Sequence, residues 1–215
     1  MDLKVGLLGG GSWGTTVASL TARNTPTTMW ARNEKTVKEI NKFHRNEKYL
    51  PGANLTKSLK ATNSIKKAVK NADVLVMGVP SHSFRKVLQD AKPFIRPWIP
   101  IVSLTKGLEQ GTKMRMTEVI EEIMPGHPAG ALSGPNLARE IMAGQAAASV
   151  IAMVDDTIAN ALQKVFSTGL FRVYTNEDVI GCELGGALKN VIAIAAGMGD
   201  GTGAGDNTRS AVITR

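Results

Sequence analysis

The chain has 215 residues, of which 43% are hydrophobic and 20% charged, a composition typical of globular proteins with a substantial core. Its formal net charge of +8 is concentrated in residues 1–70, which hold 13 Lys and Arg against 4 Asp and Glu, whereas residues 71–215 hold 13 against 14. Aromatic residues make up only 5% and do not interleave with the lysines, which disfavours nucleic-acid binding; the excess charge indicates solvated helix faces or attraction of a phosphorylated ligand.

The cysteine content and the N-terminal residues favour a cytoplasmic protein. Cys182 is the only cysteine, so no intramolecular disulfide can form, which suits a reducing compartment. The opening MDLKVGLLGGG lacks both the long apolar region and the cleavage site of a secretory signal. No uninterrupted apolar run approaches the roughly 20 residues of a membrane-spanning helix. We therefore expect a soluble, cytoplasmic protein without a membrane span.

Short apolar segments alternate with amphipathic helices through the first 176 residues. The run KVGLLGG predicts a strand that ends in glycines, SWGTTVASLTARN predicts the helix after it, and residues 27–31 predict a second strand. Residues 73–80 are apolar throughout, as in a strand that is buried on both faces of a parallel sheet. Further strands are predicted at 99–107, 148–154 and 171–175, and ALSGPNLAREIMAG predicts a strand, a turn and a short helix. This alternation predicts an α/β fold with a doubly wound, Rossmann-type parallel sheet.

The alternation stops at about residue 176. Residues 178–199, DVIGCELGGALKNVIAIAAGMG, predict one long helix so apolar that we expect it to be buried, yet Lys189 lies in its middle. A glycine-rich loop and one more helix, TRSAVITR, follow. We predict a Rossmann-type domain at 1–176 and the beginning of an all-helical domain at 177–215. Because the last helical pattern runs to the final residue without a capping signal, we also expect a C-terminally truncated sequence.

The stretch GGGSWG carries the spacing of a dinucleotide-binding turn. Gly9 permits the tight turn, Gly11 lets the backbone approach a pyrophosphate, and Gly14 lets helix and strand pack closely. The helix that follows presents the N–H groups of Ser12 and Trp13 to the phosphates. Because the turn lies between a predicted strand and helix, dinucleotide binding is favoured over a purely structural turn. Trp13 either stacks near the cofactor or packs against the first strand.

The second predicted strand ends where such domains distinguish NAD from NADP. Arg32 directly follows this strand, and an arginine there accommodates the 2′-phosphate of NADP. Glu34, two residues later, would instead bind the ribose hydroxyls of NAD. We favour Arg32 as the contact and NADP(H) as the cofactor about two to one, with NAD left open.

Five segments in order resemble one enzyme family. GGGSWGTTVA, MWAR, LTKGLE, SGPNLAREI and ELGGALKNVIAIAAGMGDG make residues 4–215 strongly similar to bacterial NAD(P)-dependent glycerol-3-phosphate dehydrogenases. The last segment is highly specific to that family, whereas the glycine turn is common to many dehydrogenases. The resemblance implies hydride transfer from NAD(P)H to dihydroxyacetone phosphate, giving sn-glycerol 3-phosphate for glycerophospholipid synthesis. It also implies that the second domain serves substrate binding and dimerisation, with a homodimer at full length.

The resemblance also implies roles for individual residues. By this resemblance the cofactor is bound at its pyrophosphate by Ser12, Trp13 and the three glycines, at its adenosine end by Arg32, and along its border by Ala138. The substrate is bordered by Gly134 and Asn136, and Lys106 contacts both cofactor and substrate. Lys189 contacts the substrate and is the catalytic residue. Many members have Ser or Thr in place of Asn136. The family's substrate phosphate is held by the arginine of a later Ser-Arg-Asn motif that this sequence does not contain, so we expect this chain to bind the cofactor but to lack much of the phosphate site and most of the helical domain.

The chemistry that this assignment requires centres on Lys189. A lysine can donate the proton that a reduced ketone needs, and it accepts one in the reverse direction. The reverse direction requires a neutral amine, which burial or a nearby cation favours, and Lys106 is the candidate cation. Alternatively, Lys189 extends its ammonium into water and Lys106 is an exposed turn residue. His82 is interpreted as an ordinary loop residue rather than a catalyst, and the three scattered histidines predict no metal site. The alternative functions are a related hydroxyacid dehydrogenase and a cofactor-binding but inactive fragment.

Overall fold

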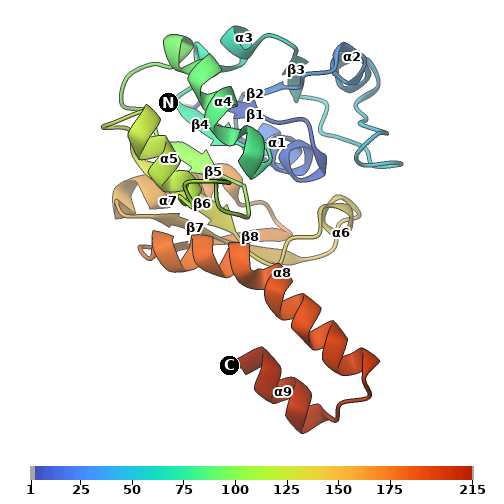
Figure 1. Cartoon of the computed structure of the whole chain (residues 1–215). Helices are drawn as coiled ribbons and strands as arrows, with labels where there is room; N and C mark the ends of the chain where they lie inside the picture. Colours follow the sequence, from blue (N-terminus) through green and yellow to red (C-terminus); the bar gives the residue numbers. More distant parts are fainter. Residues whose placement is uncertain (1–2, 215) are drawn as a thin grey trace.

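A single eight-stranded sheet organises the chain, which is described over residues 3–214 in a computed structural model (Figure 1). The strands are β1 (Val5–Leu8), β2 (Thr27–Trp30), β3 (Lys60–Thr62), β4 (Val74–Met77), β5 (Ile101–Ser103), β6 (Ala129–Ser133), β7 (Ala147–Met153) and β8 (Phe171–Asn176). Their order across the sheet is β3-β2-β1-β4-β5-β6-β7-β8. The chain thus builds outward from β1 in one direction and from β4 in the other. The carboxyl ends of β1 and β4, where the direction changes, are the expected ligand position in such a sheet.

Helices cover both faces of this sheet. The helices of the chain are α1 (Ser12–Asn24), α2 (Glu34–Phe43), α3 (Ile65–Val69), α4 (Ser81–Ala91), α5 (Met116–Ile123), α6 (Ala138–Met142), α7 (Asp156–Phe166), α8 (Val179–Gly201) and α9 (Asp206–Thr214), with a 3-10 turn at Lys92–Phe94; α9 and most of α8 lie away from the sheet. Helices α1, α6 and α7 share one hydrophobic cluster with the strands, and α3, α4 and α5 share the other. The α/β, doubly wound fold class is confirmed.

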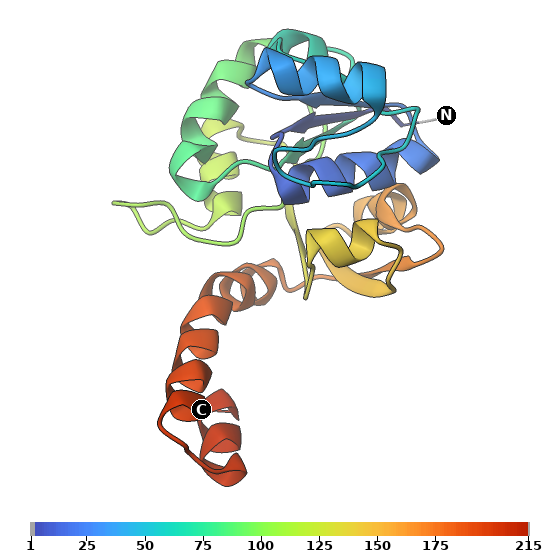
Figure 2. The same ribbon diagram turned by 90° about the vertical axis from the view of Figure 1, so that its right-hand side faces the viewer.

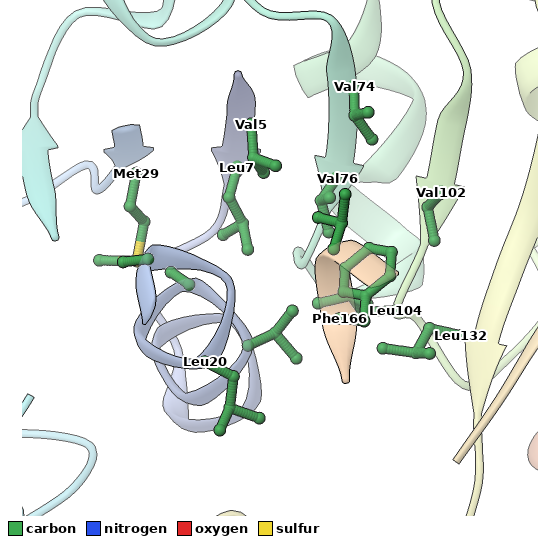
Figure 3. Packing of buried hydrophobic residues seen from close by; sticks show 14 of the residues in the cluster. Val5, Leu7, Leu20, Met29, Val74, Val76, Val102, Leu104, Leu132 and Phe166 are labelled. Atoms are coloured by element: carbon green, nitrogen blue, oxygen red, sulfur yellow. The ribbon is translucent and has the colours of Figure 1, made fainter. Parts of the chain in front are cut away.

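Strand β4 shows why a continuously apolar run was diagnostic. Its Val74 and Val76 belong to the cluster beneath α1 and α7, together with Phe166 (Figure 3). The alternate residues Leu75 and Met77 belong to the cluster on the opposite face. All four side chains are at most 1% exposed. The period of two along a strand therefore buries every residue when both faces are covered.

The sheet departs from a purely parallel arrangement at one end. β6 and β7 pair antiparallel, with Leu132 opposite Ile151, whereas the other neighbouring pairs are parallel. The connection between them contains only the five-residue helix α6, which does not carry the chain back to the far edge as a full crossover helix does. Strand β3 was not predicted, because it has three residues, Lys60–Thr62, and only Ala61 is buried.

The expectation that the long apolar helix is buried was wrong. Within the described residues, α8 buries only Val179 and Glu183. Its first half packs on β6 and β7 and its second half contacts α9, and these contacts leave most of the helix surface uncovered. Figure 2 shows α8 running away from the sheet, with α9 folded back beside it. By length and composition alone α8 is sufficient to cross a membrane, with a mean hydropathy of 1.5 over its most apolar window. Such a lone helix is weak evidence for a span, and its Glu183 is paired inside the protein.

Candidate active site

A cleft of about 630 Å³ lies at the carboxyl ends of β1 and β4. Its floor is the glycine turn, Gly9–Gly14, and its walls come from the end of β2, the start of α4 and the segment after β5. The predicted dinucleotide-binding residues Gly9, Gly11, Ser12, Trp13, Gly14, Arg32 and Lys106 all line it. The sheet topology thus brings together residues that are separated by up to a hundred positions in the sequence.

The close approach of backbone segments makes two of the three glycines of the turn necessary. Gly9 has a φ of +139°, and a Cβ there would lie 2.2 Å from the carbonyl oxygen of Gly78. A Cβ on Gly14 would lie 2.3 Å from the carbonyl oxygen of Gly9. A Cβ on Gly11 would meet nothing within 4 Å, so this glycine is not needed for packing. Its small size instead leaves open space at the cleft surface, as the backbone needs if a pyrophosphate is to approach it.

The N-terminus of α1 is suited to an anion. Gly11 is its N-cap and offers no side chain to the first-turn N–H groups, and that turn carries no acidic residue. The partial positive charge of this helix end therefore faces the cleft at Ser12 and Trp13. Trp13 also packs edge-on against Phe171 of β8, with ring centroids 6.1 Å apart. Its buried Nε1–H has no acceptor among the described residues, which leaves a donor for a bound ligand.

At the far end of the cleft, cations line the position expected for the adenosine. Arg32 lies here together with Lys48 and Tyr49, which follow α2. The ammonium of Lys48 lies 5.2 Å from the centroid of the Tyr49 ring. Glu34 is absent from the described lining, and its carboxylate is instead 2.8 Å from the ammonium of Lys38. Sequence reasoning missed Lys48 and Tyr49, for which the only signal was the general excess of basic residues in the first 70 positions.

A second pocket of about 240 Å³ adjoins the cleft, and Lys106 lines both. The ammonium of Lys106 donates a hydrogen bond to the carbonyl oxygen of Gly134 at 2.6 Å. Lys189 reaches the same pocket from α8. Burial of the Lys106 ammonium lowers its pKa from the ordinary range, and the charge of Lys189 lowers this pKa further. Lys106, the cation that the sequence suggested as a neighbour of Lys189, thus lines the same pocket as Lys189.

Glycines open the face of α8 that lines this pocket. The lining includes Cys182, Gly185 and Gly186, which precede Lys189 by seven, four and three positions and therefore share its side of the helix. A Cβ on Gly186 would lie 3.0 Å from the Ser133 hydroxyl and 3.6 Å from the side chain of Lys106. Small residues on this face therefore allow α8 to approach the ends of β5 and β6. Lys189 is itself solvent-exposed, so the burial expected of its ammonium is not observed.

Two predicted site residues lie outside the lining of both described pockets. Asn136 donates from Nδ2 to the Ser149 hydroxyl at 2.8 Å, and its buried Oδ1 has no partner among the described residues. Ala138 begins α6 and packs against the core beside α1. His82 does line the cleft, but as the second residue of α4 rather than in a loop. No cluster of metal-ligating side chains occurs within residues 3–214.

The segment that follows Lys106 is fixed by an ion-pair network. Arg85 of α4 binds Glu109 through Nε and Nη2 at 2.8 and 2.9 Å, and it also pairs with Glu122 of α5 at 2.8 Å. The Thr112 hydroxyl donates to Glu109 at 2.6 Å. The hydrogen bond from Arg85, supported by the one from Thr112, lowers the pKa of Glu109 to about 2. This network holds the loop beyond Lys106 against α4 and α5.

Comparison with known proteins then assigns the chain to a family. The pattern described as the N-terminus of NAD-dependent glycerol-3-phosphate dehydrogenase matches residues 4–159, and the corresponding C-terminal pattern matches residues 178–215. The chain belongs to the NAD-dependent glycerol-3-phosphate dehydrogenase family. The predicted domain boundary at residue 176 lies between the two matched segments and stays a prediction, as do the roles of the individual site residues.

Relatives and solved structures agree with this assignment. A protein of Sphingopyxis alaskensis named glycerol-3-phosphate dehydrogenase [NAD(P)+] 2 is 64% identical over 215 residues, which are 100% of this chain and 65% of the relative. One of Mycobacterium avium is 56% identical over 213 residues, 99% of this chain and 62% of the relative. The glycerol-3-phosphate dehydrogenase structure from Coxiella burnetii has a TM-score of 0.89 and 34% identity, covering 99% of this chain and 66% of that one. This chain thus spans about two thirds of the length of these family members.

Proposed function

We propose that the protein is an oxidoreductase that interconverts dihydroxyacetone phosphate and sn-glycerol 3-phosphate with NAD(P)H and supplies cytoplasmic glycerophospholipid synthesis. One observation carries this proposal: Lys106 lines both the dinucleotide-type cleft and the pocket that contains Lys189. A cofactor seated on the glycine turn and a small substrate beside Lys189 would therefore meet at Lys106. The names of the relatives support the same reaction.

Each group in the two pockets has a defined task in this reaction. The glycine turn and the first N–H groups of α1 would hold the pyrophosphate of a bound NAD(P)H, which would supply the hydride for the ketone carbon. Reduction leaves an alkoxide, to which Lys189 donates a proton from its ammonium. The ammonium of Lys106 stabilises the developing negative charge on the same oxygen, while its bond to the Gly134 carbonyl fixes its direction. The two lysines thus act on one oxygen atom from different segments of the chain.

The substrate assignment is tested by steady-state assays on the natural-length protein. We expect NADPH oxidation with dihydroxyacetone phosphate to exceed that with the keto forms of small β-hydroxy acids by at least roughly 100-fold in kcat/KM, because the site must pair with a phosphorylated substrate. A preference for a hydroxyacid pair would instead support a related hydroxyacid dehydrogenase. NADPH binding at micromolar concentrations without any turnover would support a protein that binds the cofactor but is inactive.

The proposed preference for NADP(H) rests on Arg32 and Lys48, which give the adenosine end of the cleft two cations. We expect Arg32→Ala to weaken NADPH binding roughly 10-fold more than NADH binding, because only NADPH offers a 2′-phosphate to pair with the guanidinium. Lys48→Ala is expected to act in the same direction with a smaller effect. Nicotinamide fluorescence titrations of both cofactors measure the ratio of their dissociation constants.

Glu34→Ala is the matched control for this experiment. Glu34 lies two residues from Arg32 but pairs with Lys38, so its removal should leave the ratio of the two dissociation constants within twofold of the original. An equal loss of NADPH and NADH affinity in Arg32→Ala would show that the guanidinium contacts a part common to both cofactors. The preference for NADP(H) would then have no support at this position.

Two further parts of the proposal concern the ligand and the partner of the protein. The ligand is a small phosphorylated molecule rather than a nucleic acid, and the basic first third of the chain would attract it. The natural-length protein forms a homodimer through its helical domain. Exposed apolar side chains on the second half of α8 support such a protein contact, with Val191, Ile194 and Met198 each more than 60% exposed.

A further inference from the structure

Glu183 is a buried charged residue that lies outside both pockets. It belongs to the second turn of α8, and its side chain is only 5% exposed. Its carboxylate accepts a hydrogen bond from Arg115 Nη1 at 2.9 Å and one from the backbone N–H of Thr117 at 3.0 Å. The Thr117 hydroxyl also donates to it. A buried carboxylate is retained at low cost only when it is paired in this way.

The partners of Glu183 form the beginning of α5. Arg115 is the N-cap of that helix, and its side chain also pairs with Glu118 at 3.1 Å. Thr117 lies in the first turn, so the carboxylate faces the positive end of the helix dipole. Helix α5 follows the loop that begins at Lys106 and is tied to α4 by Arg85. The contact therefore joins α8 to the fixed segment that carries Lys106.

The rest of α8 is held weakly within the described residues. Val179 and Glu183 are its only buried residues, and both lie at the end that touches the sheet. Beyond them the helix leaves the sheet, as Figure 2 shows. The direction in which α8 leaves, and with it the position of Lys189 over the pocket, therefore depends on contacts near Glu183. The open glycine face at Gly186 permits close approach but makes no directional bond of its own.

We propose that Glu183 is a positioning residue, which through Arg115 and Thr117 fixes α8 so that Lys189 faces Lys106 across the substrate pocket. This inference rests on the proposed function for its catalytic consequence. Its structural content, the relative placement of two lysines, can be tested without any turnover. A reacting proton donor displaced by about 1 Å loses on the order of 100-fold in rate, so a modest swing of α8 matters.

Glu183→Gln tests the proposal in the natural-length protein. The amide keeps the shape of the side chain but loses the charge. Its NH₂ group cannot accept a hydrogen bond, so it cannot replace the carboxylate oxygen that accepts from Arg115 and Thr117. We expect kcat with dihydroxyacetone phosphate to fall at least roughly 10-fold, while the NADPH dissociation constant stays within twofold because the glycine turn is untouched. Thr117→Val, which removes one donor and retains the volume and the backbone N–H, should reduce kcat by an intermediate factor.

Glu118→Gln is the matched control. It removes the same charge from the same arginine, but its bonds to Arg115 lie within the first turn of α5 and do not join that turn to α8, so kcat should remain within twofold of the original. The proposal is overturned if folded Glu183→Gln retains normal kcat. It is equally overturned if Glu183→Gln loses kcat and NADPH affinity in parallel, as a generally loosened fold would, or if Glu118→Gln matches the loss.

A second measurement separates this inference from the proposed function. Of the described groups around Lys106, the charge of Lys189 acts on it from α8, the Gly134 carbonyl accepts a hydrogen bond from its ammonium, and the thiol of Cys182 lies in the same pocket. NMR titration of this chain with ¹³C-labelled lysine follows the pKa of Lys106 directly. Glu183→Gln should raise that pKa toward its ordinary value by moving Lys189 away, and Glu118→Gln should not. An unchanged pKa of Lys106 refutes the positioning role of Glu183 even if the natural-length protein reduces dihydroxyacetone phosphate. A raised pKa of Lys106 supports the positioning role even if the natural-length protein does not reduce this substrate.

Discussion

Replacing Lys189 by alanine in the natural-length protein is expected to lower kcat for dihydroxyacetone phosphate reduction by roughly 10²- to 10⁴-fold, the usual contribution of a positioned general acid. The alkoxide left by hydride transfer would then have to take its proton from water. NADPH affinity should stay within twofold, because Lys189 lines the smaller pocket and not the glycine cleft. Steady-state kinetics combined with NADPH titration measure the two quantities separately.

Two further variants define what Lys189 contributes. Lys189→Arg keeps the positive charge, but a guanidinium does not give up its proton at neutral pH, so this variant should be nearly as impaired as Lys189→Ala. Full activity in the arginine variant would mean that Lys189 acts only through its charge. Lys164→Ala on α7 removes an exposed lysine from outside both pockets and should leave kcat unchanged. Near-normal turnover in Lys189→Ala would refute its assignment as the proton donor.

The fold was predictable where burial imposes a pattern on the sequence. β4 is apolar at every position because the helices on both faces of the sheet cover it, and the sequence shows this directly. β3 escaped prediction because three residues with one buried side chain produce no pattern. The antiparallel pairing of β7 with β6 was not predicted, because the direction of a strand depends on where the connection through α6 leads the chain. The periodicity of the sequence does not encode that path. The exposure of α8 was missed because composition records how apolar a helix is and not what covers it.

The residues of the candidate site could likewise be predicted only where a local sequence pattern marks them. The glycine turn was recognisable because backbone contacts within one short segment exclude side chains at Gly9 and Gly14. Lys106 and Lys189 were recognised through segments typical of the family. Lys48 sits in a loop without regular spacing, so nothing local placed it beside Arg32. Glu183 pairs with Thr117 across 66 positions, a relation that only the folded chain creates.

Substitutions in the glycine turn are expected to have the second large effect, on stability and on cofactor affinity. Gly14 and Gly11 differ in what an added methyl group would meet. Gly14→Ala would place a Cβ 2.3 Å from the Gly9 carbonyl oxygen, a contact that only a backbone shift can relieve. We expect about 1–3 kcal/mol of lost stability from this overpacking. Cofactor affinity should fall at least roughly 100-fold as well, because the turn that holds the pyrophosphate is distorted.

Gly11→Ala should separate binding from stability. A Cβ there meets nothing within 4 Å, and the residue has a φ of −74°, which alanine adopts freely, so the melting temperature should change little. Yet the methyl group would stand at the surface that a pyrophosphate must approach, so NADPH affinity should still fall at least roughly 10-fold. Thermal unfolding and NADPH titration of both variants decide the matter. If Gly11→Ala binds NADPH normally, the pyrophosphate does not lie on this turn, whereas a loss of binding at full stability locates the cofactor against the N-terminus of α1.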